Sequence, residues 1–272
     1  MRSPDLPRAF LDLPLAHRGL HDSTNGCIEN SLSAVASAVD AGYGIEIDVQ
    51  LAACGEAMVF HDGTLDRLTQ ETGPLRVRTA LELETLELRD SSDTVPRLTS
   101  VLEAVAGDVP LLIEIKDQDG ALGKRVGPLE CRVAACLQTY SGPVAVMSMN
   151  PFAVAAFAAH APKGIAWGLT TSAFPAVRWP DVPEQRRLAL ANIISKKEIG
   201  ASFISHDWLD LESTAVVAER ANGTPVLCWT VRSLAEEVRA RHHCDNITFE
   251  GYQPEKISSP DSIASAQSGT AT

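Results

Sequence analysis

Short segments of aliphatic and β-branched residues alternate with helical patterns along almost the whole chain, and this alternation most constrains the fold. Helical periodicity is clearest over residues 30–42, where Asn30 is the expected N-cap and Gly42 the expected stop. Strands separated by helical crossovers form parallel sheets, and eight of them most simply form a (β/α)8 barrel. The eight predicted strands are 13–19, 42–50, 111–116, 144–149, 165–169, 202–206, 225–230 and 246–249.

One predicted strand is additional to the eight. The segment 57–62 follows strand 42–50 after only six residues, which is too short for a helical crossover. We therefore expect a hairpin with a turn near Cys54-Gly55, which sets His61 roughly across from Asp48. Between residues 63 and 110 no strand is predicted, residues 80–90 are expected to be helical, and a crossover helix is expected to begin near 95–105. Further helices are expected within 121–141, 150–160, 211–222 and 233–243.

The size and composition of the chain favour one large domain. Its 272 residues are 45% hydrophobic and 21% charged, enough for a substantial core, and no linker interrupts the middle of the chain. We assign residues 1–257 to a single barrel domain. The polar, low-complexity residues 258–272 are predicted to be a disordered tail.

Charge and hydropathy exclude some classes of partner. The formal net charge of −12 disfavours nucleic acid, so an anionic ligand needs a local group of cations. The chain has no run of about 18 apolar residues, so no transmembrane segment is predicted. The six cysteines form no CxxC pair and are interpreted as reduced thiols, which leads us to expect a cytoplasmic protein. The oligomeric state is not predicted.

Acidic residues stand within two of the predicted strands. Glu46 and Asp48 alternate with Ile45, Ile47 and Val49, so both acids project to one side. On an edge strand they would face water, whereas in a buried parallel sheet they need a partner such as a cation. Strand 111–116 repeats the pattern.

That second strand carries Glu114 and Lys116 at alternate positions. Taken alone, this pair is better interpreted as an ion pair within the strand than as part of a site. His17 and Arg18 end the first strand, and His61 ends the hairpin. In a barrel the ends of strands meet at one face, so these residues converge there with Glu46 and Asp48.

Three carboxylates meeting at one point have a chemical consequence. Without an ion they would repel one another and take up protons. Oxygen ligands of this kind suit a hard divalent cation, either Mg²⁺ or Ca²⁺. The strand ends therefore predict one divalent cation at the barrel mouth.

The chain carries six short motifs in order: HRG (17–19), EN (29–30), EIDV (46–49), VFHD (59–62), LIEIK (112–116) and CWTV (228–231). Together they resemble the motifs of the glycerophosphodiester phosphodiesterase family. The resemblance covers about residues 15–255 and implies a TIM barrel enzyme that cleaves glycerophosphodiesters to glycerol phosphate and an alcohol. It implies that Glu46, Asp48 and Glu114 hold the metal and that His17 and His61 are the general acid and base. It further implies that Arg18 and Lys116 contact the phosphate, that Trp229 forms an apolar wall, and that Glu29-Asn30 supports the site.

This assignment is chemically consistent. A phosphodiester is anionic, so a metal and Arg18 would lower the barrier by neutralising its oxygens, and two histidines can shuttle protons near neutral pH. We favour His61 as the group that protonates the leaving alkoxide. The nucleophile is either water or the substrate's own 2-hydroxyl, which would first give a cyclic phosphate.

Three positions depart from the family pattern. Ile28 replaces the usual proline before Glu-Asn, Arg232 follows CWTV where the family commonly has Asn, and Phe249-Glu250 stands where a Thr-Asp pair is common. The last two put substrate preference in question more than the type of reaction. Arg232 is interpreted either as a contact to an anionic head group or as a solvated residue at a helix start.

Two alternative functions remain open. One is phospholipase-D-like hydrolysis of lysophospholipids, which would need an apolar entrance near Trp229, Phe152 and Trp167. The other is a non-catalytic barrel that binds a phosphate ligand. An aldolase or isomerase is disfavoured because the neighbouring Glu114 would keep Lys116 protonated.

Overall fold

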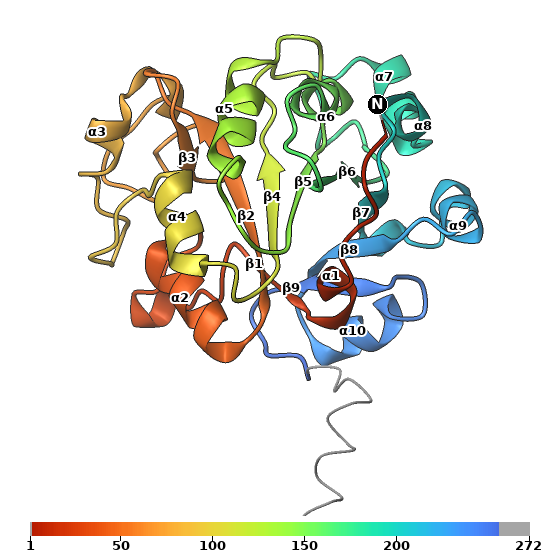
Figure 1. Ribbon diagram of the computed structural model, residues 1–272, viewed down its shortest axis with the longest axis horizontal. Coiled ribbons are helices and arrows are strands. Elements are labelled where there is room, and N and C mark those ends of the chain that lie inside the picture. Colours follow the sequence, from red (N-terminus) through yellow and green to blue (C-terminus); the bar gives the residue numbers. More distant parts are fainter. Residues whose placement is uncertain (1, 256–272) are drawn as a thin grey trace, which may run out of the picture.

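The chain forms a closed barrel of parallel strands with an additional strand outside the ring, as the computed structural model of residues 2–255 shows (Figure 1). The first strand pairs with both the second and the last, which closes the ring. The strands are β1 (Leu15–His17), β2 (Gly44–Leu51), β3 (Ala57–Val59), β4 (Leu111–Ile115), β5 (Val144–Ser148), β6 (Ala166–Thr171), β7 (Phe203–Asp207), β8 (Val226–Val231) and β9 (Asn246–Phe249). The (β/α)8 prediction is thus confirmed.

Helices surround the ring, and an apolar core lies between helices and strands. Ile45, Ile47 and Val49 of β2 pack in this core with residues of the neighbouring helices. The helices are α1 (Ala9–Asp12), α2 (Leu32–Ala41), α3 (Ala80–Leu83), α4 (Leu98–Val105), α5 (Pro128–Leu137), α6 (Pro151–Ala158), α7 (Glu184–Ala191), α8 (Ser195–Ile199), α9 (Thr214–Ala221) and α10 (Leu234–Ala240). Within the described residues no helix is long and apolar enough to cross a membrane.

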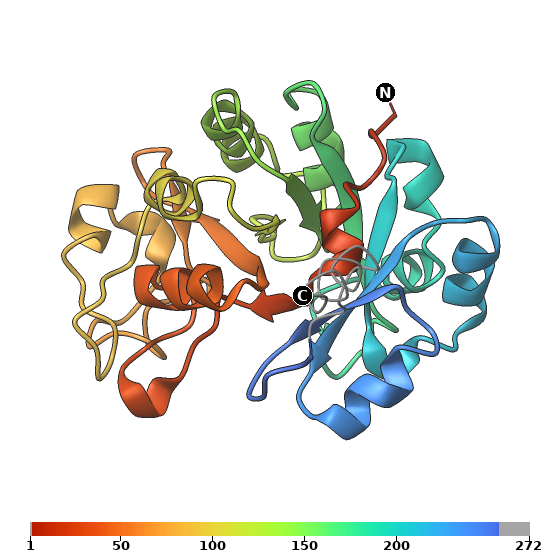
Figure 2. The same cartoon turned by 60° about the horizontal axis from the view of Figure 1, so that its bottom comes forward.

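A second apolar cluster fills the barrel itself at the starts of the strands. Phe10 of α1 and Phe203 of β7 are fully buried there. Figure 2 shows α1 at this end of the ring. The Asn246 amide of β9 donates to the backbone oxygens of Phe10 and Leu13, at 2.8 and 2.6 Å, and so fastens the last strand to the first residues of the chain. The opposite end of the barrel is left free to form a cavity.

The segment between β2 and α4 stands to one side of the barrel (Figure 1) and has a small core of its own. Strand β3 pairs antiparallel with β2, so the predicted hairpin is confirmed, and the amide of Phe60 donates to the Asp48 backbone oxygen. The prediction of a helix over residues 80–90 is wrong beyond the first turn, because α3 ends at Leu83. A capping box of Thr79 and Glu82 starts α3, but the chain then turns so that Leu88 enters the small core.

Other predicted boundaries also change. Asn30 is not the N-cap of α2, because Ser31 accepts from the Ala34 amide and fills that role. Helix α5 covers only the second part of the helix expected over 121–141. The tail predicted over 258–272 lies outside the described residues, so the assignment of residues 1–257 to one domain stays a prediction.

Candidate metal and catalytic centre

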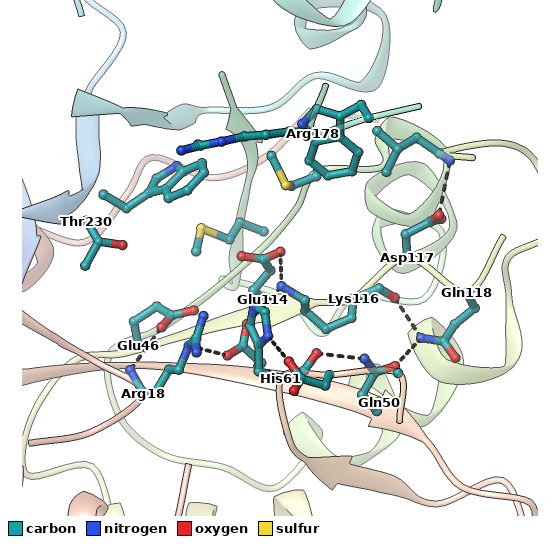
Figure 3. A pocket seen from close by; sticks show the side chains of 18 of the residues that line it. Arg18, Glu46, Gln50, His61, Glu114, Lys116, Asp117, Gln118, Arg178 and Thr230 are labelled. Atoms are coloured by element: carbon teal, nitrogen blue, oxygen red, sulfur yellow. Dashed lines mark hydrogen bonds and ion pairs between the residues drawn. The ribbon is translucent and has the colours of Figure 1, made fainter. Parts of the chain in front are cut away.

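A cavity of about 980 Å³ opens at the ends of the barrel strands, and the predicted site residues gather in it (Figure 3). His17, Arg18, His61, Lys116 and Trp229 all line it, as do the three acids Glu46, Asp48 and Glu114. Glu29 and Asn30 do not line the cavity but contact residues that do.

The turn after β1 brings the first of these groups to the mouth. Arg18 has φ +58° and Gly19 has φ +82°. A Cβ atom on Gly19 would lie 2.8 Å from the backbone carbon of Ala34 in α2, so glycine is required for this close approach. The turn points the Arg18 amide at Glu46 Oε2, 3.2 Å away.

The three acids form a buried cluster. Asp48 and Glu114 are cross-strand neighbours on β2 and β4, and Glu46 lies one pleat away. One carboxylate oxygen from each lies within 4.8 Å of the others. Burial, followed by the charges of Asp48 and Glu114, raises the pKa of Glu46 well above its usual range. This concentration of buried carboxylates fits a hard divalent cation, which would take all three as oxygen ligands.

Two cations lie against the acids. Lys116 Nζ is 3.2 Å from Asp48 and 3.0 Å from Glu114, and Arg18 Nε is 3.3 Å from Asp48. Burial alone would raise the pKa of Asp48. The positive charges of Lys116, His61 and Arg18 together instead hold this pKa far below its usual range. Asp48 is thus the permanently ionised acid of the cluster.

Each predicted catalytic histidine has a carboxylate on Nδ1. His17 Nδ1 lies 2.7 Å from Glu250, and His61 Nδ1 lies 2.7 Å from Asp62. Burial is the main cause that lowers the pKa of His17 to about 4. A carboxylate on Nδ1 leaves Nε2 as the nitrogen free for proton transfer.

A network of charged residues joins the two sides of the site. Arg67 donates to Asp62, the partner of His61, and to both oxygens of Glu29. Glu29 in turn accepts from Arg18 at 2.6 Å. Sequence reasoning missed Arg67, although it stands in the stretch HDGTLDRLT that begins at His61.

Asn30 supports the metal cluster directly. Its amide nitrogen donates to Asp48 Oδ2 at 3.0 Å, and its amide oxygen accepts from the Asp48 backbone at 3.2 Å. The residue is buried and has φ +60°, a conformation that asparagine tolerates.

An apolar wall stands opposite the charged groups. Trp229 is part of it and donates from Nε1 to the Ser205 backbone oxygen at 3.0 Å. Hydrolysis of lysophospholipids would need an apolar entrance near Trp229, Phe152 and Trp167. Of these three residues only Trp229 lines the cavity, and Trp167 packs in the core outside the ring. The remaining apolar residues of the wall are Leu122, Met147, Met149, Trp179, Trp208 and Leu209.

Comparison with known proteins agrees with this arrangement. Residues 17–244 match the profile of the Glycerophosphoryl diester phosphodiesterase family. The chain belongs to this family. A glycerophosphodiester phosphodiesterase of Caldanaerobacter subterraneus is 36% identical over 115 residues, 40% of this chain and 46% of the relative. A putative glycerophosphodiester phosphodiesterase of Bacillus subtilis is 32% identical over 124 residues, 42% of this chain and 50% of the relative.

These matches with the curated phosphodiesterases span about half of each relative's length. The fold is also that of a phosphodiesterase of Oleispira antarctica, solved in complex with the product sn-glycerol-3-phosphate. That structure has a TM-score of 0.71 and 24% identity, and the match covers 96% of this chain and 99% of the other. At this identity the similarity establishes the shared barrel.

Proposed function

We propose that this chain is an enzyme that hydrolyses glycerophosphodiesters to glycerol phosphate and an alcohol, with one divalent cation, Mg²⁺ or Ca²⁺. The observation that carries the proposal is the buried cluster of Glu46, Asp48 and Glu114, with His17 and His61 lining the same cavity. Family membership and the names of the relatives support the same reaction.

The roles of the residues follow from their positions. Glu46, Asp48 and Glu114 would hold the cation, which when bound neutralises charge on the phosphate. Arg18 and Lys116 would add positive charge at the same place. His17 and His61 would act as the acid and base through Nε2, and His61, on the hairpin, is our choice for protonating the leaving group. The nucleophile is water or the substrate's 2-hydroxyl.

The test is hydrolysis by purified protein across a panel of diesters and metals. Turnover of glycerophosphocholine or a related diester that EDTA abolishes and Mg²⁺ or Ca²⁺ restores is expected. His17→Ala and His61→Ala should each lose about 10²-fold or more in kcat. The matched control is His242→Ala, because His242 is exposed and does not line the cavity. Less than tenfold loss in either variant contradicts its assigned role.

The apolar wall favours lysophospholipids as a second candidate substrate. The cavity, at about 980 Å³, is near the upper end of the range for drug-sized ligands, which leaves space beside a small diester. Trp179 and Leu209 are among the apolar residues that line the cavity. A higher kcat/KM for lysophosphatidylcholine than for glycerophosphocholine would support this candidate. Tight binding of diesters without turnover would instead indicate a non-catalytic barrel.

The cellular setting stays a prediction. None of the six cysteines is paired in a disulfide, which is consistent with the expected cytoplasmic location. We propose that the protein binds a small-molecule diester as its substrate and does not bind nucleic acid.

A further inference from the structure

The two residues that depart from the family pattern near the end of the chain contact each other. Glu250 follows β9, and Arg232 follows β8. Arg232 Nη2 lies 3.2 Å from Glu250 Oε2. The backbones are joined as well, since the Glu250 amide donates to the Val231 oxygen at 2.9 Å.

The same Glu250 oxygen also contacts His17. Ala16 and Phe249 are paired in register between β1 and β9, so the next residues of the two strands, His17 and Glu250, extend side by side. The distance from His17 Nδ1 to Glu250 Oε2 is 2.7 Å. Glu250 is therefore a bridge between a residue proposed for catalysis and an arginine at the cavity edge.

This bridge determines how the imidazole is held. The hydrogen bond from His17, with burial opposing it, lowers the pKa of Glu250 to about 2, so the carboxylate only accepts hydrogen bonds. The proton of the neutral ring must then reside on Nδ1. Nε2 is left unprotonated on the side of Glu46, 3.9 Å from its Oε2.

Arg232 is itself held in place. Its backbone amide donates to Glu236 at 2.6 Å, and Nη1 approaches the Thr230 backbone oxygen at 3.4 Å. The Glu250 side chain is 26% exposed, so without this arginine it is free to turn toward solvent.

We propose that Glu250 is the positioning residue of His17 and that Arg232 acts only by holding Glu250 against the ring. The kinetic part of this inference rests on the proposed hydrolysis of phosphodiesters. The tautomer of His17 is independent of that reaction.

The kinetic test uses Glu250→Ala and Glu250→Gln. The alanine variant is expected to lose about 10–100-fold in kcat, with KM within about threefold of the wild type. Glutamine keeps an acceptor at the same reach and should recover part of the loss. A change confined to KM would overturn the proposal, because it would mean that Glu250 contacts the substrate.

The role of Arg232 is tested by a double-mutant cycle. Arg232→Met is expected to lower kcat about 3–10-fold in the wild type and to have no effect in the Glu250→Ala background. Equal losses in both backgrounds would overturn the assigned role of Arg232. The matched control is Glu84→Ala, which removes the ion pair between Glu84 and Arg97 outside the cavity. The Glu84 side chain is 33% exposed and the Glu250 side chain 26% exposed.

The spectroscopic test needs no turnover. Long-range ¹H–¹⁵N correlation spectra of the wild-type protein at neutral pH should show His17 as the Nδ1–H tautomer. Glu250→Ala should shift the ring toward the Nε2–H tautomer. An Nε2–H tautomer in the wild type would overturn the proposal even if Glu250→Ala fails to fold. If the wild type hydrolyses no diester but shows the Nδ1–H tautomer, the proposed function fails and the positioning of His17 stands.

Discussion

Replacing Asn30 with glycine tests how the metal cluster is supported. Glycine adopts the positive φ of +60° without penalty, so the variant removes only the amide group. The amide makes one bond to the ionised Asp48 side chain and one to the Asp48 backbone. Such bonds are worth about 1.5–3 and 0.5–1.5 kcal/mol.

Arg18 and Lys116 still hold the Asp48 carboxylate after the change, which favours the lower part of this range. We expect Asn30→Gly to lower the free energy of unfolding by about 2–3 kcal/mol. In a chain of this size that corresponds to a fall in Tm of about 4–10 °C. Asn30→Ala should lose about 1–2 kcal/mol more, because alanine is strained at positive φ.

The assay is urea unfolding in EDTA, together with calorimetric titration of Ca²⁺ and Mg²⁺ at neutral pH. Metal affinity should fall about 10–100-fold, because Asp48 loses the group that orients it. Asn222→Gly, at the exposed C-cap of α9, is the control for the added chain entropy of glycine. A loss below about 0.5 kcal/mol with unchanged metal affinity would refute the reasoning.

Three further predictions follow from the charges at the site. Because Glu46 has a raised pKa, metal binding should be accompanied by release of a proton from this carboxyl group. Calorimetry in buffers of different ionisation enthalpy measures the release, and Glu46→Gln should abolish it. Because the pKa of His17 falls from 6.5 to about 4 on folding, the unfolded chain takes up a proton first as the pH drops. The metal-free protein should therefore lose about 1–2 kcal/mol of stability between pH 6.5 and 5, and unfolding of His17→Gln at both pH values should show a smaller loss. Arg67→Met removes the side chain that joins Asp62 to Glu29. The variant is expected to lower kcat about tenfold while its melting temperature changes little. An unchanged kcat would show that the contacts of Arg67 with Asp62 and Glu29 do not contribute to catalysis.

The barrel and the acid cluster were predictable because each depends on a repeating pattern. Alternation with period two sends Glu46 and Asp48 to one side of a strand, and the same spacing returns at Glu114. The apolar residues between them require packing on the other side, and parallel pairing then brings the acids together. Local pattern and global fold agree at these positions.

Other parts depend on contacts between residues far apart in the chain. The residues 80–90 have helical composition, yet Leu88 is drawn into a small core made mainly by other segments. The partner of His17 is 233 residues away, so nothing near either residue identifies it. The apolar wall comes from the segments after β4, β5, β6 and β7 together with Met147 of β5 and Trp229 of β8, and its aromatic members have no common spacing.

The meeting of β1 with β9 has a consequence for the synthesis of the protein. Residues 15–16 pair with residues 248–249, so the ring cannot close until nearly the whole barrel has left the ribosome. Closure is a contact between distant parts of the chain, which folding reaches slowly. The His17–Glu250 contact spans this junction and forms only when it closes. A nascent or truncated chain can therefore have most of the barrel without a complete candidate site.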